Sequence, residues 1–359
     1  MDESMRESEM HTTRGRNVPI DFLRCILMFL IVLHHSSFHG CYANDSRHWL
    51  LPLLFTYLIF WHVDGFVAIS GWFGTRFSLT RLFNILGVVF FWTVARDLVV
   101  YFTQGKLPGR FAWAAGWYGS AYISFLFVAP LLNAAIEKLV ESRGKRLYIC
   151  LAIFNLGLLL NWLPYVPISL GGGAYSIVMI IGVYINARVV KLKGCVDVFS
   201  KRTMMICSLL YLLGVSVCSG FYVVKALVRK GFALQSDWIG LTIYSSPHSM
   251  VMGIAVVLFF VKYVRIRPAV SKIVERIAPL MFGVYIIHEG TGIGRCLYRI
   301  PQSWLIAHTD MNPVAIVFAT AIMAFAACLV CESLRRLLVA PLRKCLVPRL
   351  KELDARFLS

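Results

Sequence analysis

Apolar residues gather in runs of about 20 along most of this chain, separated by short polar segments that are rich in Lys and Arg. A run of about 20 apolar residues is the length that an α-helix needs to cross the hydrocarbon core of a bilayer. The pattern therefore predicts an all-α, polytopic integral membrane protein with about ten transmembrane helices. We expect these helices near residues 19–38, 51–73, 82–103, 116–136, 147–163, 174–187, 203–224, 241–261, 277–294 and 313–333.

The positive charges are distributed unevenly between alternate loops. If the N-terminus is cytoplasmic, the inner loops and the two tails hold 26 of the 36 Lys and Arg residues, and the outer loops hold 8. Cytoplasmic loops carry such an excess in membrane proteins, so we expect both termini to be cytoplasmic. Topology thus explains the net charge of +18, and without an RNA-binding motif a nucleic-acid partner is not expected.

Composition indicates one membrane domain. Apolar residues make up 58% of the 359 residues and charged residues 15%, against about 25% charged in an ordinary soluble domain. We expect a cytoplasmic polar tail at 1–17, a transmembrane domain at 18–333 and a basic cytoplasmic tail at 334–359. The ten cysteines are scattered, and the Cys328/Cys331 pair lies inside the last span without a second such pair or a nearby His. We therefore expect no metal site.

The first span carries the ionisable residues Asp21, Arg24 and His35, with His34 beside the last, among residues that are almost entirely apolar. His35 follows Arg24 by eleven residues, so on a helix it lies about 16 Å further along nearly the same face. Ionisable groups inside a membrane span usually face a protein cavity and serve function. The structural alternative is an Asp21–Arg24 pair at the headgroups, with His35 hydrogen-bonded to a neighbouring helix.

The second span carries Asp64 well inside it, with the small residues Ala68 and Gly71 on about the same face. A catalytic role for Asp64 and a simple bond to a neighbouring helix are equally consistent with this pattern. The inner loop that follows offers Arg76 and Arg81, which suit phosphate groups but also suit ordinary positive-inside anchoring.

The ninth span is irregular, because its apolar part stops after Ile287 and is followed by His288, Glu289 and three glycines within five residues. Irregular backbone at membrane depth is tolerated only beside protein or a water-filled cavity, which predicts that His288 faces a cavity. A short helix that ends early at the outer interface is the alternative. Most tryptophans, Trp117 among them, map to the outer side, where they suit either an interfacial belt or platforms for sugar rings.

Four segments together resemble the membrane-bound acyltransferase 3 family. They are IDFLRCILMFLIVLHH with its Arg-x10-His spacing, VDGFVAISGWF, GWYGSAYISFLFVAPLLN and FGVYIIHE, in the order of that family, between residue 16 and about residue 333. The resemblance implies an enzyme of the bacterial inner membrane that moves an acyl group, commonly acetyl, from cytoplasmic acyl-coenzyme A to a carbohydrate hydroxyl. Gly65 and Ala68 depart from the bulky residues usual in the second segment.

The resemblance and the chemistry of acyl transfer together assign candidate roles. An imidazole with a pKa near neutrality suits the deprotonation of an acceptor hydroxyl, so His35 is the candidate general base. Arg24, Asp64 and His288 complete the candidate catalytic set. A covalent acyl-enzyme on His35 or Ser70 is a second route. The candidate substrate-binding residues are Asp21, Ser70, Arg76, Arg81, Trp117, Tyr118, Tyr285 and Glu289.

Two other classes of protein compete with an acyltransferase. A secondary transporter also buries Asp, Arg and His beside a broken helix, but typically shows repeat symmetry, which this chain lacks. A membrane scaffold explains the spans but not the polar face of the first one. Besides membrane lipid, the expected partner is a carbohydrate or lipid-linked glycan, with acyl-coenzyme A as donor and no metal. The sequence leaves the acceptor, the acyl group and the oligomeric state open.

Overall fold

The computed structural model of the protein describes residues 16–44, 57–105, 115–142, 145–162, 172–228, 246–290 and 294–357. Regular structure in these ranges is helical and includes no strand, which confirms the all-α class. The longer helices are α2 (Val18–His39), α5 (Leu79–Gln104), α6 (Gly116–Glu141), α7 (Lys145–Trp162), α8 (Gly172–Leu192), α10 (Lys201–Val228), α11 (Pro247–Tyr263), α14 (Gly294–His308), α15 (Pro313–Leu338) and α16 (Ala340–Phe357). The shorter helices are α4 (His62–Phe73), α9 (Cys195–Val198), α12 (Pro268–Ile277) and α13 (Met281–Tyr285).

Within the described residues, five helices are long and apolar enough to cross a membrane, and the protein is therefore a multi-pass membrane protein. These five segments are Val18–His39, Leu79–Thr103, Gly116–Glu141, Lys201–Gly220 and Pro313–Leu338. The α11 helix is apolar but has 17 residues, and other expected spans overlap shorter or less apolar helices. The count of about ten spans and the cytoplasmic termini therefore stay predictions.

The ninth expected span, 277–294, is not one regular helix. Residues 278–290 form a 3-10 turn at Ala278–Leu280 (η2), the five-residue α13 and a π-helical turn at Ile286–Gly290 (η3), while residues 291–293 lie outside the described part of the chain. The side chains of this segment are largely buried, including Tyr285 and His288. Irregular backbone thus lies inside the protein, where neighbouring helices surround it. π-Helical turns are rare and are frequent at functional sites.

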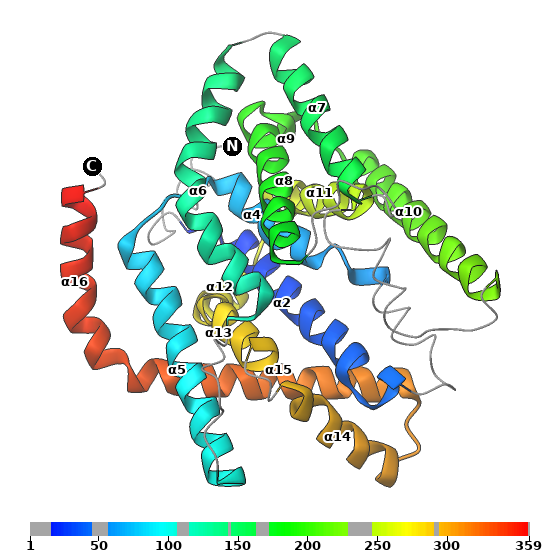
Figure 1. Ribbon diagram of the computed structural model, residues 1–359, viewed down its shortest axis with the longest axis vertical. Helices are drawn as coiled ribbons and strands as arrows, with labels where there is room; N and C mark the ends of the chain where they lie inside the picture. Colours follow the sequence, from blue (N-terminus) through cyan, green and yellow to red (C-terminus); the bar gives the residue numbers. More distant parts are fainter. Residues whose placement is uncertain are drawn as a thin grey trace.

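The α2 helix lies at the centre of the molecule (Figure 1). It contacts α4, α11, α12, α13, α14 and α15. Asn17 caps its first turn, because the Asn17 side chain accepts a hydrogen bond from the Ile20 amide at 3.2 Å. Its apolar stretch is 61% buried inside the protein, against 17% for α10 at the periphery. The polar face of α2 therefore looks into the protein rather than toward lipid.

Two regions differ from the expected segments. The second expected span, 51–73, is represented by the twelve-residue α4, while residues 45–56 lie outside the described part of the chain. The last expected span continues as α15 to Leu338, past residue 333. Residues 340–357 then form α16, which packs beside α5 (Figure 1).

Candidate functional site

A cavity of about 600 Å³ runs along the polar face of α2, between this helix and α4, α5, α6, α13 and α15. Arg24 and His35 both line it, so the eleven-residue spacing places a cation and an imidazole in one space about 16 Å apart along the axis. The other lining residues from the sequence-based set are Ser70, Arg81, Trp117, Tyr118 and Tyr285.

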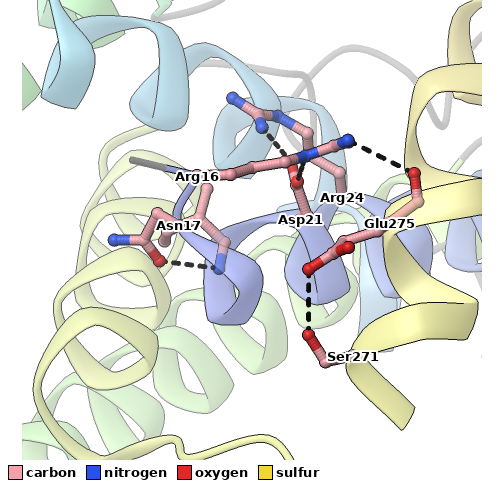
Figure 2. Close-up of polar contacts among 7 residues, drawn as sticks. Arg16, Asn17, Asp21, Arg24, Ser271 and Glu275 are labelled. Atoms are coloured by element: carbon pink, nitrogen blue, oxygen red, sulfur yellow. Dashed lines mark hydrogen bonds and ion pairs between the residues drawn. The ribbon is translucent and has the colours of Figure 1, made fainter. Parts of the chain in front are cut away.

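One end of α2 carries a network of charged side chains (Figure 2). Asp21 is buried and forms ion pairs with Arg16 and with Arg24, whose Nη1 lies 2.5 Å from Asp21 Oδ1. Arg16 also donates to the Glu275 carbonyl oxygen of α12 at 3.3 Å, and Glu275 accepts from Ser271 at 3.1 Å. Asp21 is not among the cavity-lining residues. Asp21 thus pairs with both arginines, and its part in substrate binding stays a prediction.

Three arginines line the cavity at this end: Arg24, Arg81 of α5 and Arg336 of α15. Arg24 keeps 36% of its side chain exposed while paired with Asp21, and Arg336 keeps 31% exposed beside Glu332. Guanidinium groups present several fixed donors that match phosphate oxygens. We call this group the arginine end of the cavity; it is suited to bind an anion.

Ser78 and Thr80, at the start of α5, also line the arginine end and are held by Asp354 of α16. The Asp354 carboxylate accepts four hydrogen bonds: from Ser78 Oγ at 2.8 Å, Leu79 N at 2.6 Å, Thr80 N at 3.1 Å and Thr80 Oγ1 at 2.7 Å. Desolvation alone raises the pKa of Asp354, but these hydrogen bonds outweigh it and lower the pKa to about 2. The C-terminal helix thus forms part of the cavity's support.

Aromatic residues form the wall between the two ends. Tyr285 and Tyr118 pack with ring centroids 5.8 Å apart, and Tyr285 Oη accepts from the Tyr118 amide at 3.3 Å. Trp117 packs against Tyr118 at 5.7 Å. Gly116 has a φ of +61° and lies so close to Tyr285 that an added Cβ would be 2.6 Å from Tyr285 Oη. Glycine at this position lets the start of α6 approach α13, which carries Tyr285.

Ser70 lines the same wall on the α4 side. Its hydroxyl donates to the Phe66 carbonyl oxygen at 3.2 Å, one turn back in the helix. The Ser70 side chain is therefore within the cavity but bonded to its own backbone, as is common for Ser in a helix.

At the other end of the cavity, His35 stands in a cluster with His39, His288 and Glu289. Glu289 Oε2 lies 3.5 Å from His35 Nδ1 and 3.7 Å from His39 Nε2. The His35 ring centroid is 5.1 Å from that of His39 and 5.2 Å from that of His288. We call these four residues the histidine end. The π-helical turn η3 places His288 and Glu289 behind His35, outside the cavity lining.

The hydrogen bond of His288 determines its tautomer. His288 Nδ1 is 2.6 Å from the Val284 carbonyl oxygen, and a carbonyl can only accept, so the proton of neutral His288 is on Nδ1. Its Nε2 is buried, and the described residues offer it no hydrogen-bond partner. His288 thus packs against His35 and is not among the cavity-lining residues, and its catalytic role stays a prediction.

Two further residues of the sequence-based set are not among the cavity-lining residues. Asp64 is fully buried but is not a lining residue. Its backbone lies close to α11, where a Cβ on Gly253 would be 3.0 Å from Asp64 Cβ. Arg76 is exposed, and its carbonyl oxygen accepts from Arg81 Nη1 at 2.9 Å. The structure therefore brings Arg81, but neither Asp64 nor Arg76, into the cavity with His35.

Sequence reasoning missed the contribution of α15. Arg336 was assigned to the basic tail, whereas it lines the cavity. Beside it, buried Glu332 pairs with Arg335 at 2.6 Å and accepts from Trp92 at 3.1 Å. The sequence does contain a Glu and two arginines at helical spacing at the end of an apolar run. The positive-inside rule already explains these arginines, so they gave no separate indication of a site.

A family model described as an acyltransferase domain matches residues 17–333. This range includes α2, the aromatic wall and the π-helical turn η3, which carries His288 and Glu289. The chain belongs to the acyltransferase 3 family. It matches neither a curated protein nor a solved structure.

Membership of the acyltransferase 3 family supports acyl transfer as the general activity, and it lends no support to the transporter alternative. The family match ends at residue 333, so Arg336 and Asp354 lie beyond it.

Proposed function

We propose that the protein transfers an acyl group, commonly acetyl, from acyl-coenzyme A to a hydroxyl of a cell-surface or lipid-linked carbohydrate. The observation that carries the proposal is the single cavity lined at one end by Arg24, Arg81 and Arg336 and at the other by His35. Coenzyme A joins phosphates to a thioester through a long flexible arm. The separation of about 16 Å between Arg24 and His35 suits a donor whose anionic part and reacting carbon are far apart.

His35 is proposed as the general base. Glu289 lies 3.5 Å from His35 Nδ1, which favours a proton on that nitrogen and leaves the lone pair on Nε2. Nε2 would take the proton of the acceptor hydroxyl as its oxygen attacks the thioester carbonyl carbon. The carbon–sulfur bond then breaks, and the leaving thiolate is protonated from the imidazolium. The same arrangement, in which a carboxylate orients a catalytic imidazole, occurs in hydrolases and in other transferases.

The aromatic wall is proposed to hold the sugar of the acceptor. Trp117, Tyr118 and Tyr285 place aromatic faces and hydroxyl groups between the two ends. Flat apolar rings with a polar edge suit the mixed apolar and hydroxyl surface of a pyranose. Ser70 offers a hydroxyl to the same space, and a covalent acyl-Ser70 is the second route that a test must separate from direct transfer.

We further propose that the arginine end faces the cytoplasm of a bacterial inner membrane, since acyl-coenzyme A is made there. The excess of Lys and Arg in the loops expected on the inner side supports this orientation. Reporter fusions after Arg146 and after Arg202 should read cytoplasmic, and fusions near residues 110 and 235, in segments outside the described residues, should read external. A reversed reading at two of these four sites would contradict the orientation.

Purified protein incubated with acetyl-coenzyme A tests the function directly, by following free thiol with and without candidate glycans. We expect thiol release that depends on a carbohydrate acceptor, and mass spectrometry should find the acetyl group on the glycan. Parallel incubations with other activated acyl esters test the donor. Release from another donor but none from acyl-coenzyme A would overturn the donor, and acylated Ser70 isolated without acceptor would favour the covalent route.

A further inference from the structure

The histidine end also contains a group of side chains whose donor atoms could hold a metal ion. His35 and His39 are separated by four residues on α2, a spacing that places two imidazoles on one helix face. The same spacing provides two ligands to a zinc ion in metal sites built on helices. Glu289 brings a carboxylate from a different element, the turn η3.

The distances among these three side chains approach those of a coordinated ion. Each offers one ligand atom, and the three atoms all lie within 4.8 Å of one another. Two of the separations are shorter: 3.5 Å from Glu289 Oε2 to His35 Nδ1, and 3.7 Å from Glu289 Oε2 to His39 Nε2. Ligand atoms about 2.1 Å from a tetrahedral zinc ion are about 3.4 Å apart. The site therefore needs shifts of a fraction of an ångström at Glu289 and a larger closing movement between the two imidazoles.

The surroundings also suit a metal ligand set. His35 is largely buried, and its Nδ1 makes no hydrogen bond to the described residues, since the Glu289 carboxylate lies 3.5 Å away. Arg299 donates to the His39 carbonyl oxygen at 3.2 Å and so anchors the end of α2 that carries the second imidazole. The nearby positive charge of Arg299 opposes a dication. We therefore expect binding that is weaker than at a closed structural zinc site.

We propose that His35, His39 and Glu289 form a binding site for a transition-metal dication such as Zn²⁺, and that its occupation inhibits the enzyme. Imidazole nitrogen and carboxylate oxygen are ligands that zinc prefers, and three protein ligands leave a fourth position open. The site is not assigned by the family match, which identifies only the acyltransferase domain.

The inhibitory half of this inference rests on the proposed function, and it follows from the tautomer of His35. In the transfer reaction the proton sits on Nδ1, next to Glu289, and Nε2 is the base. An ion bound through Nδ1, the nitrogen nearest Glu289, forces the single proton of the neutral ring onto Nε2. No proton is gained or lost by the ring, but the lone pair that takes the hydroxyl proton is gone. Metal binding and catalysis thus compete for the same imidazole.

The binding test uses the full-length protein in detergent, stripped of metal with a chelator and titrated with Co²⁺ as a spectroscopic probe for Zn²⁺. We expect visible absorption of a tetrahedral or five-coordinate Co²⁺ that saturates at one equivalent per chain and is abolished by Zn²⁺. His39→Gln and Glu289→Gln should each weaken Co²⁺ binding by roughly 100-fold or more, since loss of even an outer partner of a ligand costs about 10- to 100-fold.

The matched control is His308→Gln, because His308 is exposed on α14 and, among the described residues, hydrogen-bonds to its own helix at Trp304. It should leave the Co²⁺ titration unchanged. An absence of saturable binding would overturn the site. So would equal binding in the His39 and Glu289 variants, or intense near-ultraviolet bands from thiolate bound to cobalt, which would place the ion on cysteines.

The inhibition test compares acyl transfer with and without Zn²⁺ for the wild type and His39→Gln. We expect Zn²⁺ to inhibit the wild type at the concentrations that displace Co²⁺, and His39→Gln to need at least about tenfold more Zn²⁺. Binding without inhibition would overturn the inhibitory half and count against His35 as the base. Binding in a protein that transfers no acyl group from any donor would keep the metal site and overturn the proposed function, so the two failures are distinguishable.

Discussion

The two ends of the cavity differ in the kind of charge they hold. At the arginine end, Arg24 and Arg336 keep 36% and 31% of their side chains exposed, whereas His35 at the histidine end keeps 9%. Arginine is always charged, so its end attracts an anion at any physiological pH. Imidazole can both accept and donate a proton, so its end suits proton transfer. Under the proposed function one end binds and the other reacts, so mutations at the two ends should fail in different ways.

Replacing His35 should have the largest effect. His35→Gln keeps a polar side chain but removes the base, so we expect kcat to fall by about 10²- to 10⁴-fold while the donor KM changes little. Steady-state kinetics with acetyl-coenzyme A and a glycan acceptor measure both constants. His308→Gln serves as the control for removing a histidine elsewhere. Normal turnover in His35→Gln would show that the base lies elsewhere.

Replacing Arg24 should affect binding rather than turnover. A hydrogen bond to a charged group contributes about 1.5–3 kcal/mol, so Arg24→Ala should raise the donor KM by about 10- to 100-fold. A contact held throughout the reaction lowers binding more than kcat. Arg24→Lys should recover part of the loss, because it keeps the charge without the two-pronged geometry. If Arg24→Ala lowered kcat alone, the division between the two ends would be wrong.

Replacing Glu289 should show whether this residue orients His35 or binds the donor. Glu289→Gln removes the carboxylate beside His35 Nδ1 but keeps its size, so we expect kcat to fall by about tenfold, less than for His35→Gln. Glu289→Asp should retain more activity than Glu289→Gln. Changes confined to the donor KM would place Glu289 in binding instead of in orienting the base.

Replacing Asp354 should have the smallest effect on activity, and this effect should be confined to the arginine end. Its pKa is lowered from 3.8 to about 2 in the folded protein, so its stabilising contacts are fully present above pH 3.8 and are lost as the pH falls through about 2. Backbone amides at the start of α5 should therefore become less protected from hydrogen exchange as the pH falls through this range. Asp354→Asn should show raised exchange already at neutral pH.

The same variant connects Asp354 to the cavity. Ser78 and Thr80 line the arginine end, so Asp354→Asn should raise the donor KM modestly and leave the acceptor KM unchanged. Glu352→Gln on the same helix is a matched control, because Glu352 is exposed and, within the described part of the chain, pairs with exposed Arg356 of the same helix. Equal exchange in the two variants would show that the α16 contact does not hold the start of α5.

Much of the fold could be predicted from the sequence because lipid imposes one simple requirement. A spanning segment must satisfy its own backbone and present apolar side chains, and both demands appear as long apolar runs. The runs at 19–38, 82–103, 116–136 and 313–333 coincide with α2, α5, α6 and α15 for this reason. The irregular ninth segment was also visible, because glycines and polar residues interrupt its apolar pattern.

Part of the candidate site could be read in the same way. The spacing of Arg24 and His35 on one helix face is a local property, because helix geometry relates residues that are eleven apart without any knowledge of their neighbours. Both residues indeed line one cavity. Their catalytic and binding roles stay predictions until activity is measured.

Only the tertiary structure decided which distant residues join them. Asp64 and His35 both look like buried polar groups in the sequence, but packing brings His35 into the cavity lining and leaves Asp64 out of it. Arg336 and Asp354 enter the site's surroundings because α15 and α16 return to the start of α5, far away in sequence. Periodicity determines which face of a helix is polar. Which helix meets that face depends on contacts between segments hundreds of residues apart, and those contacts leave no local pattern in the chain.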